Sequence, residues 1–484
     1  MESIWSKTTE IEKFPQLSGD LETEAAVIGG GLAGILTAYF LQKCGVKAVV
    51  LEAGRVGSGQ TGNTTAKITS QHNLIYAKLL QEFGEEKARQ YASANQQAVE
   101  EFRRMIEGAG MDCEFEECPA YLYSTDPQKI NALEQEVLAA QKLGLPAEFT
   151  TQTNLPFSVA GAVRFGGQAQ FHPLKFLKEV SKELTVYEQT PVKTVEGERI
   201  QTSRGTVTAR HIIFACHFPF INAPGLYFAR MHQERSYALS LSHAARLDGM
   251  YLGVDEDGLS FRNSGNLLLL GGGSHRCGEN SKGGKYAMLR ERAAQFYPQG
   301  METACWSAQD CITLDGVPYI GTFASSVPNW YVATGFGKWG MSSSMAAARL
   351  LSDQITGKEN PCAEVFSPQR FKLSASMESL LTDGGQAVKG LSRQIFAPPR
   401  ADIEALPAGH GGVVECEGEK VGVYKDESGE VFMVSTRCPH LGCQLEWNPD
   451  EKSWDCPCHG SRFDYKGRLL DNPAQENLKE MGHA

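Results

Sequence analysis

Two cysteine–histidine pairs near the C-terminal end constrain the fold of this chain more than any other feature. The first pair is Cys438 and His440, with one residue between them, and the second is Cys456 and His459, with two residues between them. Brought to one point, these side chains can hold a two-iron, two-sulfur cluster with both thiolates on one iron and both imidazoles on the other. Neutral imidazoles raise the reduction potential of such a cluster. The chain is therefore expected to move electrons one at a time.

A structural zinc site is the alternative, because two cysteines and two histidines also suit tetrahedral zinc. Each ligand loop, however, holds a second cysteine, Cys443 in the first and Cys458 in the second. Ser461 closely follows the last histidine, and a hydroxyl there can hydrogen-bond a cluster sulfide. The proline-containing segment 472–474 can form a third loop over the metal. These details favour the iron–sulfur cluster.

The segments 438–443 and 456–461 resemble the two ligand boxes of the Rieske proteins of cytochrome bc complexes, over about residues 405–480. The resemblance implies a small all-β domain and a Rieske-type 2Fe-2S cluster on the two cysteine–histidine pairs. It also implies a disulfide between the two additional cysteines. Those proteins usually carry a tyrosine two residues after the serine, where this chain has Phe463. Loss of that donor is expected to lower the potential relative to the respiratory proteins.

A nucleotide-binding unit is predicted near the N-terminal end. An apolar strand over 24–28 is followed by a GxGxxG turn at Gly29, Gly31 and Gly34, then by a helical run and a second strand that ends at Glu52. In this pattern the glycines allow a tight turn, close approach to a pyrophosphate and close helix–strand packing, and the acid accepts from a ribose hydroxyl. The alternative is a glycine turn without a ligand.

Residues 57–69, directly after the second strand, are mostly glycines and small hydroxyl residues. Such a run can wrap an extended cofactor, although an ordinary polar loop is the alternative. The segment resembles the flavin loop of the glycine oxidase, sarcosine oxidase and D-amino-acid oxidase superfamily, and the resemblance covers about residues 22–358. It implies FAD. The expected contacts in the loop are Ser58, Thr61, Asn63, Thr64 and Thr65.

A second GxGxxG turn lies between a strand and a helix at Gly335, Gly337 and Gly340. No second strand ending in an acid follows it, so NADH is not the expected electron source. The superfamily resemblance implies that this helix points its N-terminus at the flavin ring, where backbone N–H groups stabilise negative charge. Further FAD contacts implied by the resemblance are Val192, at the adenine, Trp339 and Met341.

Two departures from the sarcosine oxidases bear on chemistry. Gly271 stands where those enzymes carry a lysine that promotes reaction with dioxygen, and Gly340 stands where they carry a carboxylate-binding lysine, with Lys338 two residues earlier. Both departures argue against dioxygen as the oxidant and against a simple amino acid as the substrate. Ala308 aligns with the position that tethers flavin in some relatives, so FAD is expected to be noncovalent, with Cys311 as the alternative tether.

The candidate catalytic residues are His72, His275 and Lys338. His72 follows the flavin loop, and His275 follows a glycine-rich strand of the expected substrate domain. The alternative for each is a packed or solvated side chain.

The length of 484 residues requires several domains, and 42% hydrophobic with 21% charged residues describes a soluble globular protein. A net charge of −11 argues against nucleic acid as a partner. Glycines break the longest apolar stretch, 25–41, so no membrane span is expected. No secretory signal is visible, and the scattered cysteines favour a cytoplasmic location.

The expected architecture is an α/β Rossmann-like FAD domain interleaved with an α+β substrate domain, followed by the all-β Rieske domain. The expected divisions are an N-terminal extension (1–21), the FAD-dependent oxidoreductase (22–366), a linker (367–407) and the Rieske domain (408–484).

The expected function is that of an FAD-dependent dehydrogenase, which takes a hydride from a small amine or N-alkyl amine or amino acid. Single electrons would pass through the Rieske cluster to an external acceptor protein or quinone. His440 and His459 are expected to lie near the surface for this transfer. The alternatives are an FAD oxidase that uses dioxygen, with an accessory cluster, and an electron-transfer protein without a substrate of its own.

Overall fold

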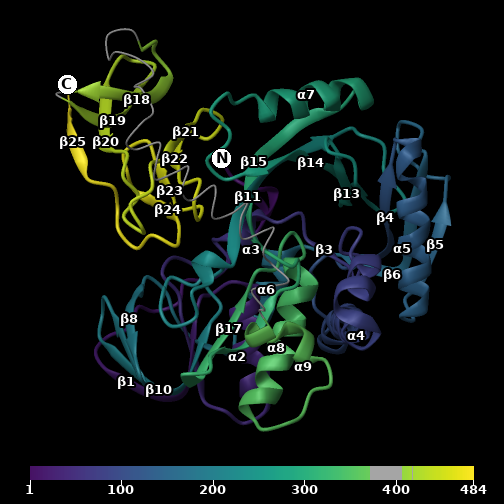
Figure 1. Cartoon of the computed structure of the whole chain (residues 1–484), viewed down its shortest axis with the longest axis horizontal. Helices are drawn as coiled ribbons and strands as arrows, with labels where there is room; N and C mark the ends of the chain where they lie inside the picture. The colour runs from purple at the N-terminus through teal and green to yellow at the C-terminus, as the bar shows by residue number, and fades with distance from the viewer. Residues whose placement is uncertain (371–405, 417, 484) are drawn as a thin grey trace.

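The computed structural model describes residues 1–370, 406–416 and 418–483, so most of the predicted linker, 367–407, lies outside the described residues. The described chain forms two large sheets, a set of helices around them and a separate pair of small sheets at the C-terminal end (Figure 1).

The first large sheet is the parallel sheet that the glycine fingerprint predicts. Its path is β16 (Tyr319–Ala324), β17 (Val327–Thr334), β10 (Thr206–Phe214), β1 (Leu21–Ile28), β2 (Ala48–Leu51) and β7 (Thr185–Tyr187). All neighbours along this path are parallel except β16 and β17. The antiparallel pair β8 (Val192–Glu196) and β9 (Arg199–Thr202) extends it beside β10. Helices α2 (Leu32–Lys43) and α8 (Gly340–Ile355) pack on each other and against its strands.

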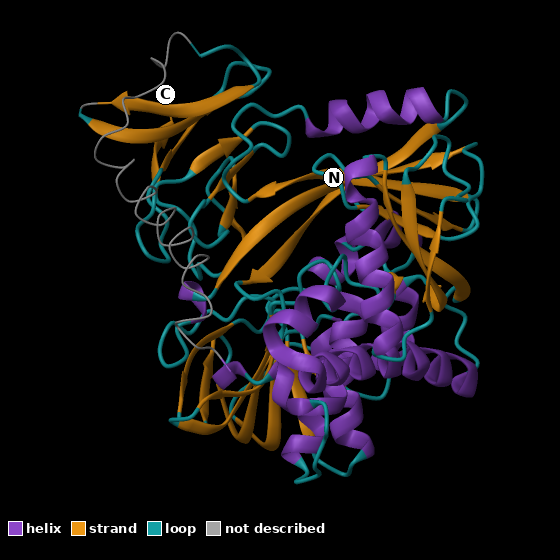
Figure 2. Ribbon diagram, turned by 45° about the vertical axis from the view of Figure 1, so that its right-hand side comes forward, coloured by secondary structure: helices purple, strands orange, loops and turns teal. Residues whose placement is uncertain are grey.

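The second large sheet is mainly antiparallel. Its path is β15 (Met301–Thr313), β11 (Met231–Ser242), β14 (Leu267–Arg276), β13 (Ser260–Ser264), β12 (Met250–Gly253), β4 (Glu116–Ser124), β6 (Gly161–Gln170) and β3 (Lys67–Ile68), with β5 (Ala147–Thr150) beside β6. Helix α7 (Lys285–Phe296) packs on β14 and β11. Figure 2 shows this sheet above the main group of helices. Those helices include α4 (Tyr76–Ala109), α5 (Ile130–Lys142), α6 (Pro173–Ser181) and α9 (Ala363–Phe366).

The chain alternates between the two large sheets. It supplies β1 and β2 to the first, β3 to β6 to the second, β7 to β10 to the first, β11 to β15 to the second, and β16 and β17 to the first. The predicted interleaving of an FAD domain and a substrate domain is therefore confirmed. The flavin loop, 57–69, belongs to the first of these crossings, from β2 to β3.

The C-terminal end forms two four-stranded antiparallel sheets, as expected for the all-β domain. One contains β18 (His410–Cys416), β19 (Glu419–Lys425), β20 (Val431–Ser435) and β25 (Glu480–His483), and the other β21 (Glu446–Asn448), β22 (Ser453–Asp455), β23 (Arg462–Asp464) and β24 (Leu469–Asp471). Trp447, Trp454 and Phe463 form much of their shared core. A Cβ on Gly411 would lie 2.4 Å from the Trp447 ring, so glycine lets the indole lie against the strand.

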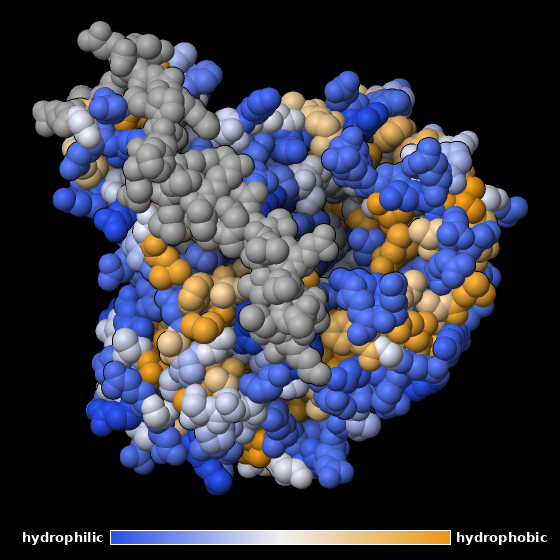
Figure 3. Space-filling view, viewed as in Figure 1, coloured by the Kyte–Doolittle hydropathy of each residue, from blue (hydrophilic) through white to orange (hydrophobic). Residues whose placement is uncertain are grey.

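Hydrophilic side chains dominate the face of the molecule in Figure 3, and apolar residues are scattered between them. None of the helices in the described ranges combines the length and the apolar character that crossing a bilayer requires.

Candidate flavin and iron–sulfur sites

The glycine turn after β1 leaves no room for side chains. Gly29 has a φ of +114°, which favours glycine. A Cβ on Gly34 would lie 1.9 Å from the carbonyl oxygen of Gly29, so only glycine allows α2 to pack this closely. A Cβ on Gly31 would lie 3.3 Å from the Thr61 hydroxyl. The turn is thus a bare backbone cradle at a helix N-terminus, which fits the pyrophosphate of FAD.

Glu52 lies directly after β2, at the carboxyl end of the first sheet. Its carboxylate accepts the N–H of Gly30 (2.6 Å) and the N–H of Gly54 (2.7 Å). Burial raises the pKa of this carboxyl, although both hydrogen bonds oppose the shift. The carbonyl of Glu52 accepts the N–H of Thr190 (2.9 Å), which brings the start of β8, at Val192, to the same end of the sheet. The cofactor contacts of Glu52 and Val192 stay predictions.

The flavin loop folds back onto the start of α2. Thr61 lies in the short helix α3 (Gln60–Asn63), and its hydroxyl accepts the N–H of Leu32 (3.0 Å). The carbonyl of Thr65 accepts from Arg262 on β13 (2.8 Å), which ties the loop to the second sheet. The side chains of Asn63 and Thr64 instead bond within the loop, and the Ser58 hydroxyl donates to the carbonyl of Arg55 just before it. Their contacts with FAD likewise stay predictions.

The N-terminal residues pack against the flavin loop. Helix α1 (Ile4–Thr8) carries Trp5, which is 0% exposed. The indole N–H donates to the carbonyl of Thr64 (2.7 Å), and the Ser3 hydroxyl donates to the carbonyl of Gly62 (2.5 Å). The first residues of the chain therefore support the flavin loop by packing and hydrogen bonds. This role was not predicted for the N-terminal extension, 1–21.

Replacing Trp5 by alanine is expected to destabilise the protein by about 3–5 kcal/mol, because it leaves a large cavity behind the loop. FAD should then dissociate faster. Trp5→Phe keeps most of the volume and loses one hydrogen bond, so it should cost only about 1 kcal/mol. Thermal unfolding and the rate of flavin release after dilution measure both effects. Equal flavin release in the alanine variant and the wild type would contradict this role.

The second glycine turn joins β17 to α8. Gly335 and Gly337 have φ values of +73° and +57°, and a Cβ on Gly335 would lie 2.3 Å from the Thr313 side chain. Helix α8 begins at Gly340, so its first backbone N–H groups have no partner within the helix. This positive helix end suits an anionic edge of a bound ring. The contacts predicted for Trp339 and Met341 remain predictions.

His72 connects the flavin loop to α8. Its Nε2 lies 2.8 Å from the carbonyl of Thr69 and 2.9 Å from the Ser342 hydroxyl, and its ring stacks on Trp339 with centroids 4.8 Å apart. The Tyr91 hydroxyl lies 2.6 Å from Nδ1. Burial lowers the pKa of His72 to about 3, so the ring is neutral near pH 7. Its catalytic role stays a prediction.

The other two catalytic candidates have different neighbours. Lys338 pairs with Glu234 on β11 (3.2 Å). A hydrogen bond from His232 and the charge of Lys338 hold the pKa of Glu234 at about 2. His275 lies 3.1 Å from the Tyr237 hydroxyl through Nε2 and stacks on the Tyr237 ring. The three candidates therefore do not share a hydrogen-bond network among the described residues, and their roles stay predictions.

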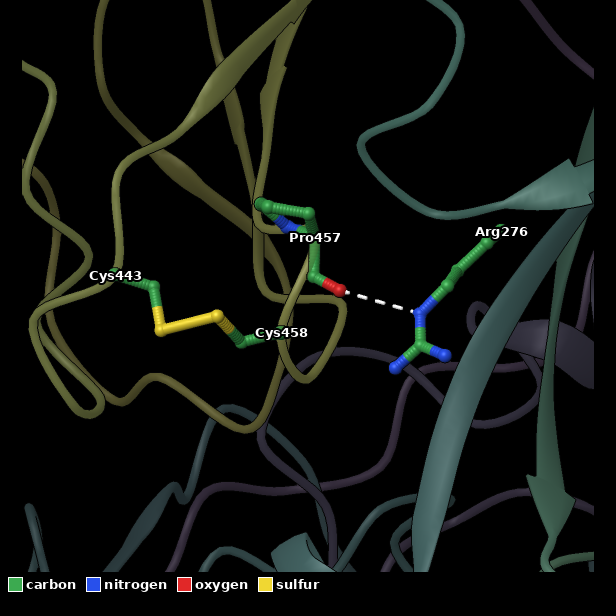
Figure 4. Close-up of a disulfide and its surroundings, with 4 residues drawn as sticks. All are labelled: Arg276, Cys443, Pro457 and Cys458. Carbon is green, nitrogen blue, oxygen red and sulfur yellow. Dashed lines mark hydrogen bonds between the residues drawn. A yellow bond between two sulfur atoms is a disulfide. The ribbon is translucent and has the colours of Figure 1, made fainter. Parts of the chain in front are cut away.

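The four predicted cluster ligands lie in two loops joined by a disulfide. Cys443 and Cys458 form this disulfide, as Figure 4 shows. Cys438 and Cys456 are 2% and 1% exposed and carry free thiols. The structure thus contains the pairing that the resemblance implied and leaves the predicted ligand cysteines available.

The histidines complete the donor set. The rings of His440 and His459 have centroids 4.9 Å apart. His440 Nδ1 is buried without a hydrogen-bond partner among the residues that the structure describes, whereas its Nε2 lies 2.9 Å from the Asn222 amide oxygen. That hydrogen bond places the proton on Nε2 and leaves the Nδ1 lone pair for a metal. An unpartnered imidazole nitrogen and two free thiols, on two loops joined by one disulfide, fit the 2Fe-2S cluster.

The third loop lies against these ligand loops. The N–H of Ala474 donates to the Ser461 hydroxyl (2.9 Å). The amide of Asn472 donates to the carbonyls of Cys216 (3.1 Å) and Phe218 (2.7 Å), which follow β10 of the first sheet. The predicted segment 472–474 therefore connects the cluster site to the nucleotide-binding domain.

The histidine side of the cluster site faces the flavoprotein. His459 is 7% exposed, and the Phe228 ring lies 5.7 Å from it and 6.4 Å from the half-buried His440. The prediction that both histidines lie near the surface is wrong for His459. The physical reason is that β11 and the segment before it cover this face of the domain, and docking between domains leaves no local pattern in the sequence.

Two glutamines bind the second ligand loop. Gln233 on β11 donates to the carbonyl of His459 (2.6 Å), and Gln309 on β15 donates to the carbonyl of Gly460 (2.8 Å). The two amides also bond each other (2.6 Å). A Cβ on Gly460 would lie 2.6 Å from Gln233. The sequence analysis missed both glutamines.

Buried charges surround this contact. Arg235 on β11 is 2% exposed and pairs with Glu451 of the Rieske domain, and Arg462 lies 3.1 Å from the same carboxylate. Asp471 accepts from Gln60 of the flavin loop (3.0 Å). On the far side of the cluster site, Arg276 donates to the carbonyl of Pro457 (3.4 Å; Figure 4).

Comparison with known proteins decides the family. Residues 24–354 match the model of the FAD dependent oxidoreductase family, and residues 398–482 match that of the Rieske [2Fe-2S] domain. The chain belongs to the FAD dependent oxidoreductase family and carries a Rieske domain. FAD and a 2Fe-2S cluster are accordingly its cofactors.

Known proteins are similar to this FAD dependent oxidoreductase either over nearly the whole chain or over about three quarters of it. YhfW of Bacillus subtilis, whose name describes a Rieske 2Fe-2S iron-sulfur protein, is 37% identical over 99% of this chain and 97% of its own length. Gamma-glutamylputrescine oxidoreductase of Escherichia coli is 21% identical over 78% of this chain and 91% of its own. The crystal structure of glycine oxidase from Geobacillus kaustophilus has a TM-score of 0.62 at 20% identity and covers 73% of this chain and 100% of its own, which shows a shared fold.

Proposed function

We propose that the protein is a dehydrogenase that oxidises an amine or N-alkyl amine or amino acid and relays the electrons through its Rieske domain to an external protein or quinone. When bound, FAD accepts a hydride and the cluster accepts one electron at a time. The names of the glycine oxidase and the gamma-glutamylputrescine oxidoreductase support an amine-type substrate.

The observation that supports the relay is that the two faces of strands β11 and β15 contact different parts of the molecule. Side chains alternate between the two faces of a strand. Gln233 and Gln309 bind the cluster loop on one face. On the other face, Ala238 and Trp306 lie in the apolar core that also contains Ala66 of the flavin loop. One layer of sheet therefore lies between the cluster-binding loop and Ala66, whereas Gln60 of the same flavin loop contacts Asp471 of the Rieske domain directly (3.0 Å).

The donor for the flavin is an organic molecule in this proposal, because the second glycine turn is followed by α8 and not by another strand that ends in an acid. The chain offers one dinucleotide fingerprint with its acid, at Gly29 and Glu52. Gly271 stands at the position of the lysine that promotes reaction with dioxygen in the sarcosine oxidases. This difference supports a dehydrogenase over an oxidase.

An anaerobic titration tests this function. Small amines and N-alkyl amino acids are added to the holoenzyme while flavin absorbance and the paramagnetic signal of the reduced cluster are followed together. We expect one class of compound to bleach the flavin and to raise the cluster signal in the same titration. Bleaching with a silent cluster, followed by rapid reoxidation in air, would favour the oxidase. Bleaching by no compound would favour an electron-transfer protein without a substrate.

A further inference from the structure

Lys67 is a half-buried cation without an acidic partner among the described residues. It closes the flavin loop and begins β3, and its Nζ donates to the carbonyl of Tyr251 (2.7 Å) and to the Ser260 hydroxyl (2.6 Å). An ammonium group has three N–H donors, so one is left over. Among the described residues no carboxylate pairs with it. Because an isolated charge is costly to bury, such a group either loses its proton or binds an anion.

The position of Lys67 connects the flavin loop to the second sheet. Ser260 is the register partner of Gly271 on one side and of Leu252 on the other. A Cβ on Gly271 would meet Ser260 at an ordinary 3.4 Å, so the strand leaves room for a larger side chain there. The Lys67 ammonium thus lies beside the strand position at which sarcosine oxidases carry their own lysine.

The surroundings of Lys67 are open on one side. Lys67, Ser260 and Leu252 each keep part of their surface uncovered. Leu252 packs on the apolar core that contains Ala66 and Ile68 of the flavin loop. Lys67 itself belongs to the flavin loop, so this group of side chains lies at the loop that is predicted to contact FAD.

The neighbouring charged and titratable groups are otherwise engaged. Arg262 on β13 donates to the carbonyls of Thr65 (2.8 Å) and Ala66 (2.7 Å), so its guanidinium holds the flavin loop. Burial raises the pKa of the Cys118 thiol on β4 to about 12, so it is neutral. Lys338, the other candidate cation, is paired with Glu234. Lys67 remains the cation that an incoming anion can satisfy.

We propose that Lys67 binds the carboxylate of the substrate, which makes the substrate an amino acid or N-alkyl amino acid and not a simple amine. This rests on the proposed function only in that both use the same FAD site. A carboxylate on Lys67 would accept the remaining N–H as a charge-assisted hydrogen bond. Gly340 stands where sarcosine oxidases carry their carboxylate-binding lysine, and Lys67 would supply this cation instead.

Binding of carboxylate probes to the FAD-loaded protein tests the proposal. Acetate, propionate and benzoate are compared with methylamine, benzylamine and inorganic phosphate, and the change in flavin absorbance reports binding. Carboxylates are expected to perturb the flavin, and Lys67→Met should weaken them roughly 10- to 100-fold, the range of a hydrogen bond to a charged group. Lys67→Arg should restore most of the affinity. The control Lys43→Met, at an exposed position, should match the wild type.

The dependence on pH provides a second readout. Burial, with a smaller repulsion from Arg262, lowers the pKa of Lys67 to about 7. The ammonium is present below that pH and lost above it, so affinity for a carboxylate should fall about tenfold for each pH unit above the pKa. Lys67→Met should remove this dependence.

Three outcomes would overturn the proposal. They are carboxylate binding that is unchanged in Lys67→Met, binding that is lost only in Lys338→Met, and a flavin that responds to phosphate or amines but not to carboxylates. Because the titration does not involve the cluster signal, it is independent of the electron relay. Failure of the relay would leave the binding result intact, and failure here would leave the relay untouched.

Discussion

Replacing Arg235 by methionine is expected to release the Rieske domain from the flavoprotein. Arg235 is 2% exposed, and its Nε lies 3.0 Å from the carboxylate of Glu451. Removing one partner of a buried ion pair costs about 3–5 kcal/mol, because the remaining charge stays desolvated. A loss of this size lowers the equilibrium constant for docking by roughly a hundredfold to a few thousandfold. Under the proposed function, reduction of the cluster after mixing with substrate should slow accordingly.

Freeze-quench measurement of the cluster signal and calorimetry of the holoenzyme check this result. The matched control is Arg290→Met, which removes an exposed bidentate pair with Glu302 (2.8 and 3.0 Å). Exposed pairs contribute about 0–1 kcal/mol, so this variant should behave as the wild type. An Arg235→Met protein with an unchanged cluster reduction rate and melting temperature would show that the interface does not depend on this pair.

The same interface is expected to respond to acid. Burial alone raises the pKa of Glu451, but Arg235 and Arg462 outweigh it and hold the pKa well below its ordinary value of 4.5. A carboxyl of this kind contributes stability above its unfolded pKa and loses it as the pH falls toward the folded pKa. The calorimetric stability of the wild type should therefore decline below about pH 4.5. Arg235→Met should flatten this decline.

Replacing Cys438 by alanine is expected to abolish the cluster and to leave the flavin in place. Cys438 is one of two buried free thiols at the site, and the disulfide between Cys443 and Cys458 does not involve it. An iron that has lost one thiolate cannot keep its four ligands, so iron and acid-labile sulfide should both disappear. FAD content should stay unchanged, because the glycine cradle at Gly29 lies in the other domain.

Metal analysis, sulfide analysis and flavin absorbance measure this outcome. Cys416→Ala is the matched control, since Cys416 is a free cysteine in β18 of the same domain and not a predicted ligand. It should keep the full cluster. Protein that contains zinc and no sulfide before any substitution would instead support the zinc site and remove the basis of the relay.

Local patterns made much of the fold predictable. The spacing of Gly29, Gly31 and Gly34 and the acid at Glu52 act over a single strand–turn–strand unit, so the sequence alone indicated the parallel sheet. The repeated crossing of the chain could be expected through resemblance to a known superfamily. The Rieske domain was equally recognisable, because each cysteine–histidine pair sits within one short loop.

The contacts between domains were not predictable. Arg235 and Glu451 are 216 positions apart, and neither belongs to a motif. Gln233 and Gln309 look like ordinary polar residues of two strands, and only the register of β11 and β15 places them side by side near His459. The same reason explains why His459 was expected at the surface. The proposed role of Lys67 was not predicted, because it depends on the absence of an acid around the side chain in the part of the structure that is described.

The buried pairing of Arg235 with Glu451 within a single polypeptide has one further consequence. The meeting of the two domains is a unimolecular event, with an effective concentration set by the connecting chain and not by how much protein a solution holds. Dilution cannot separate a flavoprotein from its own cluster, so under the proposed function the electron step between them should keep the same rate at any protein concentration. Only the encounter with an outside molecule depends on abundance.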